Sequence, residues 1–199
     1  MTPDDLRLRA RVKDELRARM KAIRRAHPAA TREKRSVAAA ERIVALPEWA
    51  SAERVAGYLP IHAELDPRPA LERGRAAGKV VVLPRVDLEA QRVVLHRWDG
   101  EPLEPGAFGI LEPSADAPIV DGVDLILVPA LAVDESGHRI GWGKGFYDKL
   151  LAEEASMAFR VAVVFQFQLL AECPVTPHDI AVHVVVTDER TIRPEPTAP

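Results

Sequence analysis

Three short apolar runs in the middle of the chain are each followed by a proline. The runs occupy residues 54–59, 79–83 and 124–128, and the prolines are Pro60, Pro84 and Pro129. Continuous apolar runs of this length, rich in β-branched residues, are typical of strands buried on both faces of a parallel sheet. Proline has no N–H group to donate, so it tends to end a strand inside a sheet. These runs therefore predict a parallel sheet of short strands.

Segments with helical spacing lie before and between these runs. Apolar residues recur on one helical face over residues 6–23, and a second helix is expected over residues 29–46, after the break at Pro28. Shorter helices are expected at residues 67–76 and 146–154, and further strands at residues 92–98, 159–165 and 181–186. The amphipathic strand 92–98 is expected nearer an edge. This alternation predicts an α/β fold, a three-layer α/β/α sandwich with a mostly parallel central sheet and the N-terminal helices packed on it.

The length of 199 residues suits one domain with a sizeable core. We expect this domain to cover residues 1–191, because no repeat or linker interrupts that stretch. Residues 192–199 are rich in proline and are expected to form a disordered tail.

Charge and cysteine content limit the possible partners. The formal net charge is -3, so no overall positive field points to nucleic acid or to an anionic membrane. Cys173 is the one cysteine, so no disulfide can form within the chain, and a cytoplasmic location is expected. The N-terminal segment is charged, and no apolar run is long enough to span a bilayer. We expect a monomer that binds a small molecule.

The stretch GWGKG places Gly141, Gly143 and Gly145 close together, with Lys144 between the last two. Glycine allows positive φ and a close approach of the backbone to a ligand, so successive N–H groups can converge on an anion. A following helix adds its own unsatisfied N–H groups. This pattern favours a phosphate-binding loop. The alternative is a flexible connection from strand to helix with a solvated lysine.

Two charged residues flank this glycine loop. Arg139 precedes it and adds a second positive charge, and Asp148 follows within one helical turn, where a carboxylate suits Mg²⁺ bound to the same phosphates. The loop is not a P-loop, because Phe146 stands where serine or threonine is required, and its spacing is not GxGxxG. The phosphate site is thus predicted from chemistry rather than from a common nucleotide signature.

The segment LILVPALAVDESGHRIGWGKGFYDKLL resembles the C-terminal signature of the 5-formyltetrahydrofolate cyclo-ligase family, also called methenyltetrahydrofolate synthetases. The resemblance covers nearly the whole chain. Its other parts are Lys13-Asp-Glu-Leu16-Arg17, Tyr58-Leu-Pro, Glu64-Leu-Asp66, Leu83-Pro84-Arg85, Gly109-Ile-Leu-Glu-Pro113 and the closing CPVTPHDIAVHVVVTDE. The glycine signature is the most specific part, and the order of the weaker matches supports it.

The resemblance implies an ATP- and Mg²⁺-dependent ring closure. 5-Formyltetrahydrofolate becomes 5,10-methenyltetrahydrofolate, and ADP and phosphate are released. In the implied mechanism the formyl oxygen is phosphorylated, the folate N10 attacks the formyl carbon, and phosphate departs. Such a transfer asks the protein mainly for positioning and for neutralisation of charge on the γ-phosphate.

The resemblance also implies roles for individual residues. Lys144 and Arg139 would be catalytic, and Asp148 and Asp179 would hold Mg²⁺. ATP would contact Lys13, Arg17, Arg139, Ile140, Gly141, Trp142, Gly143, Lys144, Gly145, Phe146 and Tyr147. The folate would contact Tyr58, Leu59, Glu64, Trp142, Phe146 and Tyr147.

The residues taken alone also allow simpler explanations. Lys13 and Arg17 lie among other basic residues, including Lys21, on what would be a solvated helix face. Asp179 would be a turn or helix-cap residue, and Glu64 an exposed residue in a loop. The remaining candidates are histidines without metal-ligand spacing, which receive no role: His62, His138, His178 and His183.

Departures from the family pattern keep two other functions open. Ala130, Ala132 and Val133 stand where the family often has glycine and phenylalanine, and Pro67 stands where threonine is frequent. One alternative is a paralogous ATP-dependent enzyme that acts on a different small acceptor. The other is a non-catalytic protein that binds nucleotide or folate, against which the retained charged residues around the glycine loop argue.

Overall fold

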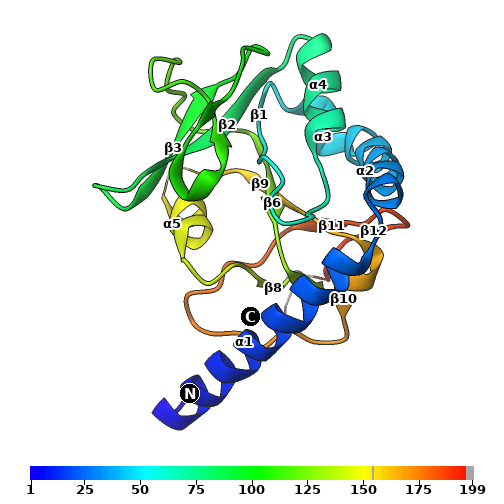
Figure 1. Ribbon diagram of the computed structural model, residues 1–199, viewed down its shortest axis with the longest axis vertical. Coiled ribbons are helices and arrows are strands. Elements are labelled where there is room, and N and C mark those ends of the chain that lie inside the picture. The colour runs from blue at the N-terminus through cyan, green and yellow to red at the C-terminus, as the bar shows by residue number, and fades with distance from the viewer. Residues whose placement is uncertain (154, 196–199) are drawn as a thin grey trace.

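A central sheet with helices on both sides organises the computed structural model, which describes residues 1–153 and 155–195. Its helices are α1 (Pro3–Ala26), α2 (Ala29–Val44), α3 (Pro47–Ser51), α4 (Arg68–Ala76) and α5 (Phe146–Ala152). Figure 1 shows α2, α3 and α4 grouped on one side of the sheet and α5 on the other, while α1 extends away from the body. Within the described residues, no helix has the length and apolar character needed to cross a membrane.

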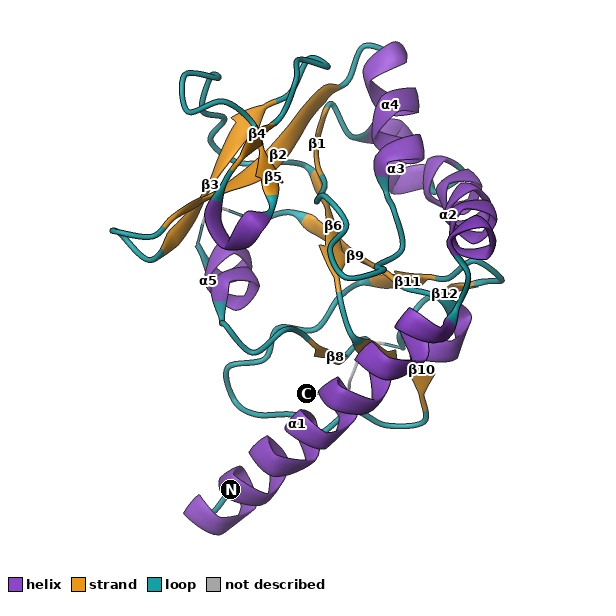
Figure 2. Ribbon diagram, in the orientation of Figure 1, coloured by secondary structure: helices purple, strands orange, loops and turns teal. Residues whose placement is uncertain are grey.

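The central sheet contains seven strands among the described residues, in the order β12-β11-β9-β6-β1-β2-β3. Their bounds are β1 (Arg54–Ala56), β2 (Val80–Asp87), β3 (Arg92–Arg97), β6 (Leu125–Pro129), β9 (Phe159–Val163), β11 (Val184–Val186) and β12 (Thr191–Ile192). The five inner strands pair in parallel, and β3 and β12 join antiparallel at the two edges. The mostly parallel sheet and the edge position of β3 are confirmed (Figure 2).

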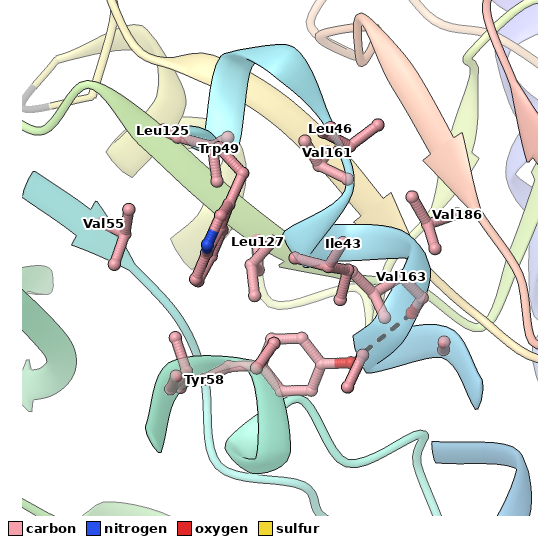
Figure 3. Close-up of a cluster of buried hydrophobic side chains, with 14 of the residues drawn as sticks. Ile43, Leu46, Trp49, Val55, Tyr58, Leu125, Leu127, Val161, Val163 and Val186 are labelled. Carbon is pink, nitrogen blue, oxygen red and sulfur yellow. Dashed lines mark hydrogen bonds between the residues drawn. The ribbon is translucent and has the colours of Figure 1, made fainter. Parts of the chain in front are cut away.

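Alternate residues of each inner strand face opposite layers, because successive side chains of a strand point to opposite faces. In β6, Leu125 and Leu127 join the buried cluster beneath α2, α3 and α4, where Figure 3 shows them beside Trp49. Ile126 and Val128 join the second cluster, which includes Leu150 of α5. Both faces of the sheet are therefore covered, which confirms the three-layer architecture.

A second, smaller sheet carries α1. It contains β10 (Leu169–Leu170), β7 (Ala132–Asp134) and β8 (Arg139–Ile140). Met20 of α1 packs there with Leu131, Ile140 and Cys173. Of the two N-terminal helices, α2 packs on the central sheet as expected, whereas α1 packs on this smaller sheet. Because the glycine loop begins directly after β8, α1 lies next to that loop.

Residues 99–120 contain a small hairpin. β4 (Glu104–Pro105) pairs with β5 (Leu111–Glu112), and the turn between them includes the 3-10 segment η1 (Ala107–Gly109). A second 3-10 segment, η2 (Gln166–Gln168), follows β9. The hairpin matters for function because its tip forms one side of the cleft described below.

Several predicted boundaries need correction: β1 ends at Ala56 and β9 at Val163, and three further boundaries have a visible cause. β2 continues through Pro84, because β2 pairs with β1 only as far as Val82 and a missing N–H beyond that point breaks no bond to β1. The predicted strand 181–186 is shorter, because the Val182 N–H bonds to the Gly137 carbonyl instead of a neighbouring strand. Ile192 pairs within the sheet instead of starting a tail, and residues 196–199 lie outside the described residues.

Candidate functional site

A cleft of about 400 Å³ opens at the carboxyl ends of β1 and β6. Its walls come from segments far apart in the sequence: residues 58–64, Pro129, and the glycine loop with the first turn of α5. The β4–β5 hairpin contributes Phe108 and Glu112. Ligands of parallel α/β sheets bind at this edge. The structure thus brings the glycine loop and the segment that carries Glu64 to one cleft.

The glycine loop presents its backbone donors without internal partners. Gly143 and Gly145 have φ of 88° and 73°, a left-handed conformation that residues with a Cβ adopt only at a cost. Among the described residues, no acceptor receives a hydrogen bond from the backbone N–H groups of residues 141–148. Backbone donors without partners at a cleft are available to an anion. The loop therefore offers what a phosphate group requires.

Arg17 of α1 holds the glycine loop in place. Its Nε donates a hydrogen bond of 2.9 Å to the carbonyl oxygen of Gly141. A Cβ added to Gly143 would lie 3.1 Å from Cζ of Arg17, so the guanidinium touches the loop backbone there as well. Arg17 also pairs with Asp14 on its own helix, at 2.6 Å. The residue assigned to ATP by resemblance thus directly contacts the loop assigned to the same ligand.

Lys144 sits at the mouth of the cleft. Its side chain is exposed, and Nζ lies 5.9 Å from the ring centroid of Phe108. No carboxylate among the described residues forms an ion pair with it. Phe108 in turn lies 6.0 Å from the ring of Phe146. The ammonium group is therefore not neutralised by the protein and faces the space that an anion would enter.

Arg139 and Asp148 form an ion pair in the cleft. Arg139 Nη2 lies 2.5 Å from Asp148 Oδ1, and the arginine side chain is 3% exposed while the aspartate side chain is 35% exposed. Nε of Arg139 is buried and has no hydrogen-bond partner among the described residues. The pair therefore presents a carboxylate, and one donor without a partner, close to the glycine loop.

The second predicted metal ligand, Asp179, is bound to Lys13 instead. Lys13 Nζ lies 2.5 Å from Oδ2 of Asp179, which also accepts a hydrogen bond of 2.6 Å from the Thr176 N–H. Burial alone would raise the pKa of Asp179, but the hydrogen bonds from Lys13 and Thr176 outweigh it and lower that pKa. Neither Lys13 nor Asp179 lines the cleft. The structure therefore does not bring Asp179 into the cleft that contains Asp148.

The acidic residues fit a magnesium ion that arrives with phosphate rather than a resident metal centre. Within residues 1–153 and 155–195, no group of three or more acidic, histidine or cysteine side chains could hold a metal ion. Mg²⁺ in nucleotide sites is usually bound through one or two carboxylates together with the substrate phosphates. The partly exposed carboxylate of Asp148 meets that requirement.

Glu64 is a buried acid, which excludes its explanation as an exposed loop residue. Its side chain accepts hydrogen bonds from the Ile61 N–H at 3.0 Å and from Trp142 Nε1 at 2.7 Å. Burial raises its pKa, although the Ile61 hydrogen bond, the charge of Arg24 and the Trp142 hydrogen bond oppose that rise. The preceding residue, Ala63, has φ of 66°. Strained backbone of this kind clusters at ligand sites and persists only where the surroundings enforce it.

The aromatic residues near Glu64 differ in what they offer a ligand. Tyr58 is 3% exposed, and its hydroxyl donates to the Leu65 carbonyl at 2.9 Å, so it belongs mainly to the core. The Tyr147 hydroxyl is buried without a hydrogen-bond partner among the described residues. Burial raises the pKa of both tyrosines, so both remain protonated donors. Tyr147 is therefore the better candidate for a ligand contact, while Leu59 and Phe146 supply apolar wall.

Ile140 is the predicted ATP contact that the structure places elsewhere. Its side chain is 1% exposed and packs in the cluster beneath α1. It does not line the cleft. Its contribution to the site is to hold β8 in place immediately before the glycine loop.

Several residues of the site region carry no role in the sequence prediction, and Lys21, His62 and Arg24 are three of them. Lys21 and His62 line the cleft, and Arg24 is fully buried 3.6 Å from Glu64. The burial of Arg24 could have been predicted from helical spacing. The buried residues of α1 are Lys13, Met20 and Arg24, and all three lie on one stripe of the helix. Charged residues on the apolar stripe of a helix indicate partners inside the protein.

The departures from the family pattern lie away from the cleft. Ala130, Ala132 and Val133 are buried in the two cores, and none of them lines the cleft. Pro67 is the N-cap residue of α4. None of these positions therefore contributes a side chain to the walls of the cleft.

Comparison with known proteins gives a consistent result. Residues 9–188 match the 5-formyltetrahydrofolate cyclo-ligase family. The chain is 36% identical over 195 residues to the 5-formyltetrahydrofolate cyclo-ligase of Mycolicibacterium smegmatis, covering 92% of this chain and 96% of that protein. It is 32% identical over 158 residues to the enzyme of the same name from Escherichia coli K12, covering 76% and 87%. The solved structure of Aquifex aeolicus 5,10-methenyltetrahydrofolate synthetase superposes with a TM-score of 0.82 at 32% identity, covering 94% and 95%.

Proposed function

The chain belongs to the 5-formyltetrahydrofolate cyclo-ligase family, and we propose that the cleft is where this ligase converts 5-formyltetrahydrofolate to 5,10-methenyltetrahydrofolate with Mg²⁺ and ATP. The observation that carries the proposal is the row of backbone N–H groups at residues 141–148, which have no partner within residues 1–153 and 155–195, next to the exposed ammonium of Lys144. No other arrangement in the cleft is as well suited to a terminal phosphate.

In this proposal the glycine loop binds the γ-phosphate of ATP. The N–H groups of the loop donate to phosphate oxygens, and Lys144 neutralises charge on the group being transferred. Arg17 acts by holding the carbonyl of Gly141, so that the loop keeps its conformation when the nucleotide binds. Lys13, one helical turn before Arg17, holds the middle of α1 in place through its ion pair with Asp179.

Magnesium would be held by Asp148 together with phosphate oxygens. Bound there, the ion would supply neutralisation of negative charge on the phosphates. Arg139 already orients this carboxylate through its ion pair, and its Nε is a further donor for a phosphate. Asp179 remains, by our proposal, a residue that positions α1 rather than a metal ligand.

The folate would occupy the side of the cleft formed by residues 58–64 and Trp142. Two hydrogen bonds, from the Ile61 N–H and from Trp142 Nε1, fix the carboxylate of Glu64 in one orientation. Its remaining lone pairs would accept hydrogen bonds from a ring that presents N–H donors. The Tyr147 hydroxyl is a further polar group, and it has no hydrogen-bond partner among the described residues. Apolar surface from Leu59, Val86 and Phe108 would cover the ring faces.

With both substrates in place, the reaction needs no covalent intermediate on the protein. The formyl oxygen forms a bond to the γ-phosphorus while the bond to ADP breaks. N10 of the folate then attacks the formyl carbon, the carbon–oxygen bond breaks, and phosphate leaves with its electron pair as N10 loses its proton. The protein contributes orientation of the two reactants and stabilisation of the developing charge.

A turnover assay tests this proposal. Purified protein is incubated with Mg·ATP and 5-formyltetrahydrofolate, and methenyltetrahydrofolate is followed by its near-ultraviolet absorbance together with ADP release. We expect both products in equal amounts. ADP without the folate product would indicate a different acceptor, and absence of nucleotide binding would indicate a non-catalytic protein.

A further inference from the structure

Arg24 is the most deeply buried charged residue among those described. Its exposed fraction is 0%, and Nε, Nη1 and Nη2 all lack a hydrogen-bond partner among the described residues. The nearest carboxylate is Glu64, whose Oε1 lies 3.6 Å from Nη1. An arginine remains charged in a protein, so this residue places a full positive charge in the interior. Such a charge needs a reason beyond packing.

Glu64 connects Arg24 to two other segments. One oxygen accepts from Trp142 in the glycine loop, and the other accepts from the Ile61 N–H in the turn after β1. Arg24 itself comes from the last turn of α1. One carboxylate therefore joins three segments that are far apart in the sequence, and it does so at the wall of the cleft.

The indole of Trp142 is held by charge as well as by this hydrogen bond. Lys21 Nζ lies 4.7 Å from the ring centroid, and Arg24 Cζ lies 5.1 Å from it. The ring of His62 lies 5.3 Å away at 49°. Cations over an indole ring stabilise its position. Trp142 is thus a connecting residue of the wall, with its ring already engaged by the protein.

We propose that Arg24 is a positioning residue for the cyclo-ligase reaction: it keeps Glu64 in the carboxylate form, and that carboxylate fixes Trp142 and with it the glycine loop. The inference rests on the proposed function for its effect on turnover, but not for its effect on Glu64. Nothing in it requires Arg24 to touch either substrate.

The ionisation of Glu64 depends on its burial, on the hydrogen bond from the Ile61 N–H and on the charge of Arg24. The titratable groups that act on it are Arg24 from α1, Tyr58 after β1 and Tyr147 from α5, and Lys21 and His62 flank the adjacent indole. The two tyrosines are neutral, since burial raises the pKa of each. Burial favours the protonated form of a carboxyl group, and an opposite charge nearby favours the ionised form. Arg24 supplies that charge at 3.6 Å.

The test follows Glu64 through the fluorescence of Trp142 in the ligand-free protein. The signal is the difference between each variant and the same variant carrying Trp142→Phe, recorded as pH is lowered. In Arg24→Met the midpoint is expected to move up by about one to three pH units, because the opposite charge is lost. Arg24→Lys should move it back towards the wild type. The matched control is Arg25→Met, a neighbouring exposed arginine, which should leave the midpoint unchanged.

Activity is measured in parallel. The acid limb of the kcat/KM profile for 5-formyltetrahydrofolate should shift in Arg24→Met in the same direction as the fluorescence midpoint, and Arg24→Lys should restore it. A fluorescence midpoint unchanged by Arg24→Met would overturn the inference whatever the activity shows. A shifted midpoint with no turnover in any variant would leave Arg24 in this role towards Glu64 and would count against the proposed function alone.

A double variant keeps the test decisive if Arg24→Met does not fold. Arg24→Met combined with Glu64→Gln leaves no charge buried without its partner, so this variant should fold and unfold at a higher temperature than Arg24→Met alone. A double variant no more stable than the single variant would contradict the coupling between Arg24 and Glu64.

Discussion

Nε of Arg17 donates a hydrogen bond of 2.9 Å to the carbonyl oxygen of Gly141, 124 residues later in the chain. This bond uses an acceptor of the glycine loop and leaves the N–H groups of the loop free. The same guanidinium stands where a side chain on Gly143 would have to pass. Helix α1 therefore holds the loop backbone at Gly141 and Gly143 without using any of its N–H donors.

Lys144→Ala should lower kcat by about 100-fold, in line with the loss of one group that stabilises transferred charge. Binding of 5-formyltetrahydrofolate, titrated without nucleotide, should change little, because the ammonium lies at the mouth of the cleft near Phe108. Lys149→Ala is the matched control, since Lys149 is an exposed lysine of α5, the helix that follows the loop, and does not line the cleft. Equal losses of rate and of folate binding would show that Lys144 does not act on the phosphate.

Gly145→Ala and Gly122→Ala separate backbone strain from ligand contact. Both glycines have similar left-handed φ, 73° and 69°, and a Cβ on either meets no atom within 4 Å. Each substitution should cost about 1–2 kcal/mol of unfolding free energy, measured by urea titration. The KM for ATP should rise about tenfold, equivalent to ~1.4 kcal/mol, for Gly145→Ala alone. Similar KM values for the two variants would mean that the space beside Gly145 is not occupied by the nucleotide.

Asp148→Asn should raise the Mg²⁺ concentration needed for half-maximal rate by about tenfold, a loss of ~1.4 kcal/mol. The amide keeps the size of the side chain but lacks the negative charge that the ion requires. The measurement is a magnesium titration at fixed ATP, and Asp179→Asn serves as the comparison. If Asp179→Asn shifts the titration as far as Asp148→Asn does, Asp179 is a metal ligand after all.

Acid should weaken the link between α1 and the segment that carries Asp179. The pKa of Asp179 is lowered in the folded protein, where burial is outweighed by hydrogen bonds from Lys13 and Thr176. A carboxyl group whose pKa is lower in the folded state stabilises the protein at pH values above its unfolded-state pKa, about 3.9 for aspartate. This stabilisation is lost as pH falls through the folded-state pKa. Asp179→Asn should cost about 1.5–3 kcal/mol at pH 7, and this cost should shrink below pH ~4. Asp116→Asn, on an exposed loop, is the control, and a cost independent of pH would refute the assignment.

The sequence predicted those parts of the fold that depend on local patterns. Residues 125–128 are apolar throughout because β6 is covered on both faces, and this property is visible in the residues themselves. The prediction that Pro84 ends β2 is wrong. The missing N–H of a proline interrupts a sheet only where a neighbouring strand would accept its hydrogen bond, and β1 pairs with β2 only as far as Val82. The position at which β1 stops pairing with β2 depends on the register of the two strands, and it cannot be read from residues 79–87 alone.

The candidate site also has features that local sequence predicts and features that depend on long-range packing. Glycine permits the positive φ seen at Gly143 and Gly145, so the loop could be found from its composition. The hydrogen bond from Trp142 to Glu64 joins residues 78 positions apart, and nothing in the sequence around either residue indicates that the two are partners. The resemblance assigns Lys13 and Asp179, 166 positions apart, to ligands, whereas their ion pair with each other depends on how α1 packs. Long-range polar pairs are where the sequence alone is least informative.

The central claim is that the backbone amides of the glycine loop bind the terminal phosphate of the nucleotide. The direct measurement is the amide spectrum of ¹⁵N-labelled protein titrated with Mg²⁺ and a non-hydrolysable ATP analogue. We predict that the amide resonances of residues 141–148 shift to saturation and that their exchange with solvent slows. Saturable shifts at other residues, with those of residues 141–148 unchanged, would contradict the account.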